Sequence, residues 1–360
     1  MKKIIGLLAA ATLMSSAFVS CDIVSYDIVL FDTTEENIEI QVPNTYDEQY
    51  FANIRAYKKT DHCVFFGYYA QWAQAEGVEG WKENPASWGE RIIGLPDSVD
   101  IVNLWMGVPS NDPDSPDYSP IAYQDMKYAQ EKLGTRFVAH ADASNYRHKF
   151  TLDGVEYDMT TQGHGEEILR AFARYWVNRV ITHELDGVDW DYEGWAGNDL
   201  AIVIEECGKY FGPKGQDPSK LLVVDYHSSI PPAAIEPYID YVFNQLYDQI
   251  SDTEFSGNDI QSIYDRVSSW LPASKYIPGE SSGKDYYVNG GRDFTETNGN
   301  TESAYGGRMH SIEGFARWNP TQGKKGGFGV FYFGRDYYVN SAYPYMNIRR
   351  AIQQANPAVN

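Results

Sequence analysis

The chain has 360 residues, enough for two average domains or for one large barrel. Hydrophobic residues make up 43% and charged residues 22%, values that exclude a disordered or collagen-like chain. The 29 basic against 50 acidic residues give a net charge of −21, which would repel nucleic acid and anionic membrane surfaces. Aromatic residues reach 15%, with 28 Tyr and 9 Trp. Either the surface stacks on hydroxyl-rich ligands such as sugars, or a large core carries tyrosines at its edge.

The N-terminal residues have the pattern of an export signal. Two lysines precede an apolar stretch at 4–14 and mostly small residues at 15–20, a segment too short for a mature membrane-spanning helix. The segment ends at Cys21 in Ala-Phe-Val-Ser-Cys, which resembles the lipobox of bacterial lipoproteins. We therefore expect 1–20 to be a lipoprotein signal peptide and Cys21 to carry the lipid. The expected location is the outer membrane or cell surface of a Gram-negative bacterium.

Two further cysteines, Cys63 and Cys207, lie in an apolar strand-like run and in a helical stretch. An exported protein can pair two such cysteines, but buried free thiols are the favoured interpretation. The sequence contains no CxxC motif and no Cys/His cluster, and its seven histidines are scattered singly. We therefore expect neither a metal nor a cofactor.

Segment 21–60 is acidic and polar, and we expect a lipid-anchored tether that ends in one short helix. In 61–360, short β-branched or aromatic runs alternate with longer helical patterns. The eight predicted strands are 64–69, 101–106, 136–140, 187–192, 221–227, 241–246, 276–278 and 329–333. The eight predicted helices are 85–93, 121–133, 165–182, 199–211, 233–239, 259–271, 311–318 and 343–354. This alternation predicts one α/β domain, a (β/α)8 TIM barrel, with a doubly wound open sheet as the alternative.

Two long polar loops, 109–120 and 281–310, follow the second and seventh predicted strands. The chemistry of such a barrel lies on loops at the C-terminal ends of its strands, and long loops are often functional rims or mobile segments. Both interpretations stay open for 281–310. The Asp-rich loop 109–120 lacks the spacing of an EF-hand, so we expect a solvated turn there.

The fourth predicted strand belongs to the most informative stretch, Leu-Asp-Gly-Val-Asp-Trp-Asp-Tyr-Glu-Gly at 185–194. Because side chains alternate along a strand, Asp189, Asp191 and Glu193 share one face, and the apolar residues between them suit packing under the helices. Carboxylates about 6–7 Å apart in a low-dielectric core repel each other, so some must be protonated. A metal site or an acid catalyst would explain why the fold tolerates this repulsion. The lack of other metal-ligand motifs favours the acid catalyst.

The full pattern Asp-x-x-Asp-x-Asp-x-Glu, formed by Asp186, Asp189, Asp191 and Glu193, resembles the signature of family 18 glycoside hydrolases. The resemblance implies that Glu193 is the general acid that protonates the glycosidic oxygen. It implies that Asp191 orients the 2-acetamido group and stabilises an oxazolinium ion, with Asp189 below it sharing its proton and Asp186 structural. Since the motif supplies no carboxylate nucleophile, the acetamide oxygen of the substrate would attack the anomeric carbon.

The sixth predicted strand gives a second match to the same family. Residues 244–248, Asn-Gln-Leu-Tyr-Asp, are similar to the family's Met-x-Tyr-Asp segment, with Gln245 in place of Met. The resemblance implies that Tyr247 holds the acetamide oxygen through its hydroxyl and that Gln245 binds the N-acetyl group or the intermediate. The other expected substrate contacts are Asn244, Tyr68, Trp105 and Tyr332.

Other positions depart from the chitinase pattern of this family. Many members end the third strand with Ser-x-Gly-Gly, where this chain has Phe-Val-Ala-His-Ala-Asp at 137–142. The Trp of chitinases would fall on the eighth strand, where this chain has Phe-Tyr-Phe at 331–333, and no α+β module separates the last two strands. These features resemble the short-barrel endo-β-N-acetylglucosaminidases, which cut the chitobiose core of N-linked glycans.

The sequence therefore favours an exported, monomeric glycoside hydrolase that acts on a glycan or glycoprotein and contacts the membrane only through its lipid. A chitinase or chitooligosaccharidase with the same chemistry is one alternative. A non-catalytic glycan-binding lipoprotein is the other, although such proteins usually lack the acid that Glu193 supplies here.

Overall fold

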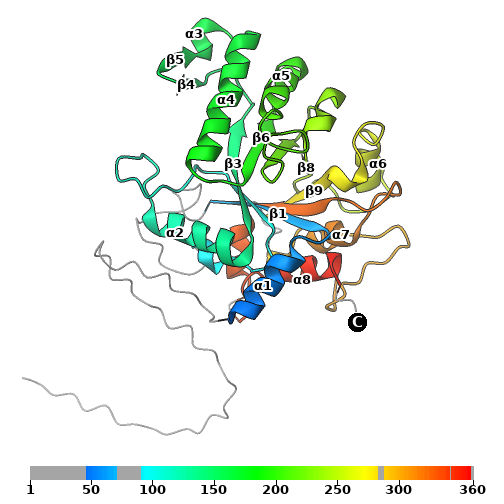
Figure 1. Ribbon diagram of the computed structural model, residues 1–360. Coiled ribbons are helices and arrows are strands. Elements are labelled where there is room, and N and C mark those ends of the chain that lie inside the picture. The colour runs from blue at the N-terminus through cyan, green and yellow to red at the C-terminus, as the bar shows by residue number, and fades with distance from the viewer. Residues whose placement is uncertain (1–45, 71–90, 283–287, 341, 358–360) are drawn as a thin grey trace, which may run out of the picture. The chain divides into compact units, whose positions relative to one another are not determined.

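Eight parallel strands close into a barrel in the order β1-β10-β9-β8-β7-β6-β3-β2 (Figure 1). The computed structural model describes residues 46–70, 91–282, 288–340 and 342–357, all within one compact unit of the chain. The strands are Val64–Tyr69 (β1), Ile101–Leu104 (β2), Arg136–Asp142 (β3), Gly187–Tyr192 (β6), Leu221–Tyr226 (β7), Tyr241–Gln245 (β8), Tyr276–Ser281 (β9) and Gly327–Phe331 (β10). The predicted (β/α)8 barrel is confirmed, and its closure excludes an open sheet. The predicted signal peptide and Cys21 lie outside the described residues.

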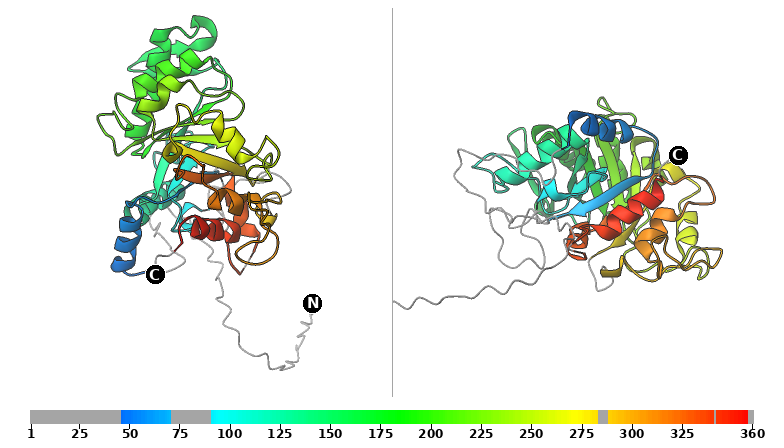
Figure 2. Two further views of the ribbon diagram at one scale, coloured as in Figure 1. Left: turned by 90° about the vertical axis from the view of Figure 1, so that its right-hand side faces the viewer. Right: turned by 90° about the horizontal axis from the view of Figure 1, so that it is seen from below.

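Helices between the strands cover the outer face of the barrel (Figures 1 and 2). They are α2 (Pro120–Tyr128), α4 (Glu166–Thr182), α5 (Gly197–Cys207), α6 (Ile260–Asp265), α7 (Ser311–Arg317) and α8 (Met346–Ala355). The helix predicted at 233–239 is a 3-10 helix, η4 (Ala233–Tyr238), because Pro237 inside it has no N–H for an α-helical hydrogen bond. The helix predicted at 259–271 is α-helical only over its first half.

Two elements lie before and beside the barrel. The helix α1 (Glu48–Tyr57) begins after Asp47, whose carboxylate accepts a hydrogen bond from the backbone of Tyr50, and it occupies the place of the predicted short helix. A hairpin of β4 (Lys149–Leu152) and β5 (Val155–Asp158) follows β3 and was missed by the sequence analysis. Its Asp153-Gly154 turn, with φ of 52° and 79°, is the typical hairpin signal that would have revealed it.

The C-terminal helix α8 lies beside β1 (Figure 2). Asn356, just after α8, donates from Nδ2 to the carbonyl oxygen of Cys63 and accepts from the backbone N–H of Cys63, each at 2.9 Å. Cys63 and Cys207 are both buried, unpaired thiols. Among the described residues, no helix is long and apolar enough to cross a membrane.

Apolar side chains fill the barrel interior below its C-terminal end: Val64, Phe66, Ile101, Val138, Leu221, Val223, Phe243 and Ile277. Phe243 on β8 occupies the space that Gly279 and Gly329 on the following strands leave open. A Cβ atom added at either glycine would overlap the Phe243 ring. The packed lower interior therefore supports whatever side chains lie above it.

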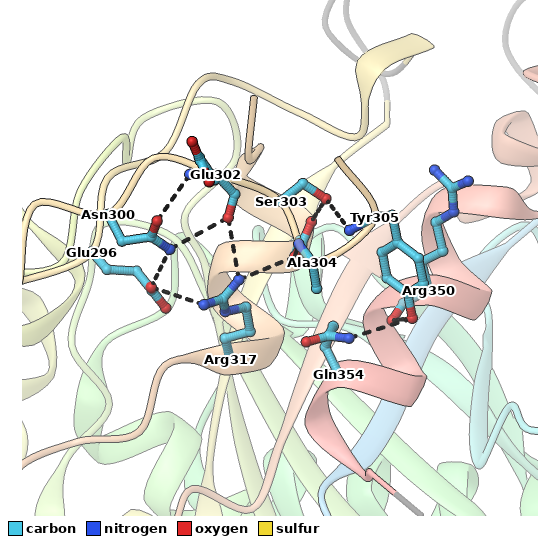
Figure 3. A network of polar contacts seen from close by, with 10 residues as sticks. Glu296, Asn300, Glu302, Ser303, Ala304, Tyr305, Arg317, Arg350 and Gln354 are labelled. Carbon is cyan, nitrogen blue, oxygen red and sulfur yellow. Dashed lines mark hydrogen bonds and ion pairs between the residues drawn. The ribbon is translucent and has the colours of Figure 1, made fainter. Parts of the chain in front are cut away.

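The described part of the predicted loop 281–310 is fixed to the neighbouring helices (Figure 3). Glu296 accepts hydrogen bonds from Asn300 at 2.8 Å and from Arg317 of α7 at 2.9 Å. Tyr305 contacts α8, where Gln354 donates to its hydroxyl at 3.4 Å. The described part of this loop is therefore held against α7 and α8.

Candidate active site

The three acids predicted on the fourth strand gather at the C-terminal end of β6. Asp189 is fully buried inside the barrel, Asp191 is partly buried above it, and Glu193 is exposed just beyond the last strand residue. Trp190 faces the opposite way and is fully buried in the outer core. The alternation predicted from the sequence therefore puts the three carboxyl groups in a row that runs from the barrel interior to its rim.

Asp189 lies in a polar pocket formed by side chains from strands across the barrel. Its Oδ2 accepts hydrogen bonds from the Tyr68 hydroxyl on β1 and from Nδ2 of Asn103 on β2, both at 2.9 Å. Burial raises the pKa of Asp189 to about 6, although the charge of His140 and these two hydrogen bonds act in the other direction. Tyr68 is only 1% exposed, so its ring is not available for stacking on a sugar. Its contact is with Asp189 instead.

Asp191 makes its contacts with a different set of side chains. Gln245 on β8 donates to its Oδ1 at 3.2 Å, and Nε2 of His140 on β3 lies 3.6 Å from its Oδ2. Burial disfavours the charged form of His140, but Asp191 and then Asp189 outweigh it, so the net pKa of His140 is raised. A positive charge therefore faces Asp191 from below the rim. The proton shared between Asp189 and Asp191 stays a prediction.

His140 and Asp225 are two site residues that sequence reasoning missed. His140 pairs in register with Asp189, and Asp225 on β7 pairs in register with Asp191. Asp225 is 1% exposed, and burial followed by the charges of Asp189 and Asp191 raises its pKa well above the usual range. The alternation used for the fourth strand would have found Asp225, because it follows the interior residues Leu221 and Val223 at alternate positions.

Gln245 and Asn244 lie on opposite faces of β8. Nε2 of Gln245 donates to Asp191 and, at 2.6 Å, to Oδ2 of Asp225. Asn244 donates instead to the hydroxyl of Tyr276 at 3.0 Å, away from the interior acids. It borders a rim cavity of about 260 Å³ with His227, Gln249, Asn258 and Arg266. Contact of Asn244 with substrate stays a prediction, located at this cavity, which Gln245 also lines.

Aromatic side chains form the wall opposite the acids. Phe331 at the end of β10 stacks on Tyr247 with ring centres 5.1 Å apart, and its edge meets Trp105 at 4.8 Å. Burial and the nearby acids Asp225 and Asp191 raise the pKa of Tyr247 well above its usual range, so its hydroxyl keeps its proton. Tyr332 is only 5% exposed and packs against Trp105, so little of its ring can contact a ligand.

The position of Glu193 depends on the loop that follows it. A Cβ atom at Gly194 would overlap the carbonyl oxygen of Ser144, so the two backbones approach as only glycine allows. The indole of Trp195 donates to the carbonyl of Asn145 at 2.6 Å. Desolvation and then the charge of Asp191 raise the pKa of Glu193, which favours the protonated acid at the rim.

Glu280 on β9 supports the turn after Tyr247. Its Oε1 accepts the backbone N–H groups of Asp248 at 2.7 Å and Ser281 at 2.8 Å, and Asp248 has a φ of 54°. The carboxyl group of Glu280 is fully buried, and burial raises its pKa to about 7. Nothing in the local sequence pattern marks this residue. Its contact is made between the ends of two strands, β8 and β9, that pair in the barrel.

Asp186 lies at the other end of β6. Its carboxylate accepts from the backbone of Phe137 at 2.8 Å and from Gln130 at 2.7 Å, which ties the start of β6 to β3. These contacts fit the structural part that the sequence predicted for it. Among the described residues, no group of three or more His, Cys, Asp or Glu side chains is arranged to hold a metal ion. The site thus offers an acid of raised pKa at the rim above a hydrogen-bonded interior.

Comparisons with known proteins identify chains of similar sequence and similar fold. The sequence profile described as glycoside hydrolase family 18, BT1044-like, matches residues 26–354. The chain is 27% identical over 294 residues to endo-β-N-acetylglucosaminidase F2 of Elizabethkingia meningoseptica, covering 79% of this chain and 77% of that protein. The structure of BT1044 superposes with a TM-score of 0.65 at 22% identity, covering 86% of this chain and 93% of that one. The structure of a mutant endo-β-N-acetylglucosaminidase of Cordyceps militaris, in complex with fucosyl-N-acetylglucosamine-Asn, superposes with a TM-score of 0.61 at 20% identity. The match covers 87% of this chain and 98% of that one. These two structures share the barrel fold.

Proposed function

Because the chain belongs to glycoside hydrolase family 18, in its BT1044-like group, we propose that this glycoside hydrolase is an endo-β-N-acetylglucosaminidase. Its substrate would be the GlcNAc-β1,4-GlcNAc core of N-linked glycans. The observation that carries the proposal is the position of Glu193, an acid of raised pKa, at the rim above Asp191 and Gln245. The relative from Elizabethkingia meningoseptica bears the name of this activity, and the ligand of the Cordyceps militaris structure is a sugar on asparagine.

The proposed reaction proceeds in two steps with retention. Glu193 donates its proton to the glycosidic oxygen while the acetamide oxygen of the substrate attacks the anomeric carbon, which breaks the glycosidic bond and forms an oxazolinium ion. Asp191 accepts the acetamide N–H and stabilises the positive charge, and the Tyr247 hydroxyl orients the acetamide oxygen. The carboxylate of Glu193 then takes a proton from a water that opens the ring, which restores the acid.

The interior groups favour a charged Asp191 in this reaction. Asp189 below it has a pKa of about 6 and keeps a proton in mildly acidic solution, while His140 places positive charge 3.6 Å away. Because the charge of Asp191 raises the pKa of Asp189, the acidic limb of the pH profile reflects more than one residue. Asp191→Asn is therefore expected to lower turnover more than binding, because its contribution is specific to the transition state.

The proposal is tested on three substrates: a high-mannose glycoprotein, a complex-type glycoprotein and chitotetraose. Mass spectrometry of a glycoprotein that retains a single GlcNAc would support it. Cleavage of chitotetraose alone would assign the chain to the chitinase alternative, and binding without cleavage would assign it to the non-catalytic one. Glu193→Gln should lower kcat by roughly 10²–10⁴-fold, the range for one general acid, whereas Glu167→Gln on the exposed face of α4 should not.

We also propose that the protein is exported and anchored through a lipid on Cys21, which supports action on extracellular glycoproteins. The basis is the sequence of 1–21 alone. Labelling with a radioactive fatty acid in a bacterial host should mark the wild-type chain and not Cys21→Ser. Equal labelling of both chains would contradict the proposed lipid anchor at Cys21. We propose a monomer, which size-exclusion chromatography with light scattering would test.

A further inference from the structure

Asp225 is a buried carboxyl group that neither the sequence motif nor the proposed reaction uses. It pairs in register with Asp191 on the neighbouring strand, so both side chains lie at the same height in the barrel. Its Oδ2 accepts a hydrogen bond of 2.6 Å from Nε2 of Gln245, and the same nitrogen donates to Asp191 at 3.2 Å. One amide nitrogen therefore connects the two carboxyl groups.

The charges around Asp225 decide its protonation. An ionised Asp225 would place a third negative charge beside Asp189 and Asp191 in a position that is 1% exposed. Such a cluster is costly in a low-dielectric interior, and burial together with these neighbours raises the pKa of Asp225 well above its usual range. Burial and these neighbouring acids therefore favour the neutral form of the Asp225 carboxyl group. A neutral carboxyl still accepts a hydrogen bond through one oxygen, which the contact with Gln245 requires.

The contact also determines which end of the Gln245 amide faces Asp191. A glutamine amide presents NH₂ at one end and a carbonyl oxygen at the other, and the two ends have nearly the same shape. If Asp225 did not accept from Nε2, the amide could rotate and turn its oxygen toward the charged carboxylate of Asp191. That orientation would repel Asp191 and move it away from the acetamide.

We infer that Asp225 is a neutral positioning residue that fixes the amide of Gln245 against Asp191, so that Asp191 is held for the acetamide group of the substrate. The inference rests on the proposed function, because it concerns the same reaction. It assigns Asp225 no contact with substrate. Its effect passes through Gln245 to Asp191.

Three variants test the inference against the active wild-type enzyme. Asp225→Ala should lower kcat by about 10- to 100-fold with little change in KM, because the amide loses its buried acceptor. Asp225→Asn should recover most of that loss, because its side chain accepts the same hydrogen bond without a charge. In a Gln245→Ala background, Asp225→Ala should add little further loss, since a residue that acts through Gln245 has nothing left to position. Asp240→Asn, at the N-terminal end of β8, is the matched control and should leave kcat unchanged.

An infrared measurement tests the charge state without any activity. Wild-type protein at pH 7.5 should show the infrared band of a protonated carboxyl group, and Asp225→Asn should lack it. The comparison does not use Asp225→Ala, so it can be made even if that variant fails to fold. Equal losses in Asp225→Ala and Asp225→Asn, additive losses in the double variant, or the absence of the band would overturn the inference. A wild-type protein that cleaves no glycan would instead remove the proposed function, and the band would still report on Asp225.

Discussion

The hydroxyl of Tyr68 on β1 donates a hydrogen bond of 2.9 Å to Oδ2 of Asp189 on β6. The bond joins two strands that are not neighbours in the barrel, and it stabilises the charged form of a carboxyl group that burial drives toward neutrality. Tyr68 is therefore part of what sets the protonation of the acids, although the sequence suggested a sugar contact.

Tyr68→Phe should move the acidic limb of the kcat profile to higher pH. Without the hydroxyl, the pKa of Asp189 rises, so an acidic limb set by this acid moves to higher pH. The measurement is kcat from pH 4 to 8. Tyr264→Phe, which also loses one buried hydrogen bond but lies in the outer core, should leave the limb unchanged. An unchanged limb in Tyr68→Phe would show that the hydrogen bond does not affect this acid.

The alkaline limb should respond to two charges near Glu193 in opposite directions. The acid must be protonated to act, so activity falls as the pH rises through its raised pKa. The charge of His227 lowers that pKa and the charge of Asp142 raises it. His227→Gln should therefore move the alkaline limb of kcat to higher pH, and Asp142→Asn should move it to lower pH. Shifts of the same sign in both variants would contradict this electrostatic account.

Glu280→Gln should change how stability depends on pH. The pKa of Glu280 is about 7 in the folded protein and about 4.3 in an unfolded chain. Between these values the folded state binds a proton that the unfolded state has released, so the free energy of unfolding falls as the pH rises through this window. The variant cannot ionise, so its Tm should fall less between pH 5 and 8. Parallel Tm curves for wild type and Glu280→Gln would sink this prediction, and Glu167→Gln serves as the exposed control.

Gly194→Ala should impair activity more than folding. The added Cβ would meet the backbone oxygen of Ser144, so the loop that carries Glu193 must move. A misplaced general acid loses most of its contribution, and we expect kcat to fall by at least about tenfold. Gly165→Ala, where an added Cβ meets nothing within 4 Å, is the matched control. Kinetics and thermal unfolding of both variants would be compared, and equal kcat values would contradict the prediction.

The sequence predicted those parts of the site that one strand carries by itself. Alternation along β6 was sufficient to place Asp189, Asp191 and Glu193, because all three depend on one local backbone. Contacts between strands were not accessible in this way. The pairing of Asp225 with Asp191 and the contact of Glu280 with Asp248 depend on which strands pair and in what register, which periodicity does not contain.

Some differences between the predicted and the observed structure could have been foreseen from local signals in the sequence. Asn244 lies next to Gln245 on the same strand, so strict alternation already puts its side chain on the other face. The Asp153-Gly154 pair marks the β4–β5 hairpin, and Pro237 marks the region where an α-helix cannot form. The burial of Tyr68 and Tyr332 is different, because only the assembled barrel shows how little of each ring remains accessible.

The fit of Phe243 between Gly279 and Gly329 has a consequence for evolution and for engineering of the enzyme. The ring seals the base of the site, so bulk water cannot reach the acids from underneath. A change to a small residue on β8 would open a hollow there, and solvent that entered it would bring the carboxyl groups back toward their ordinary acidity. Phe243 and the two glycines that accommodate its ring would then influence the acidity of the site through packing alone.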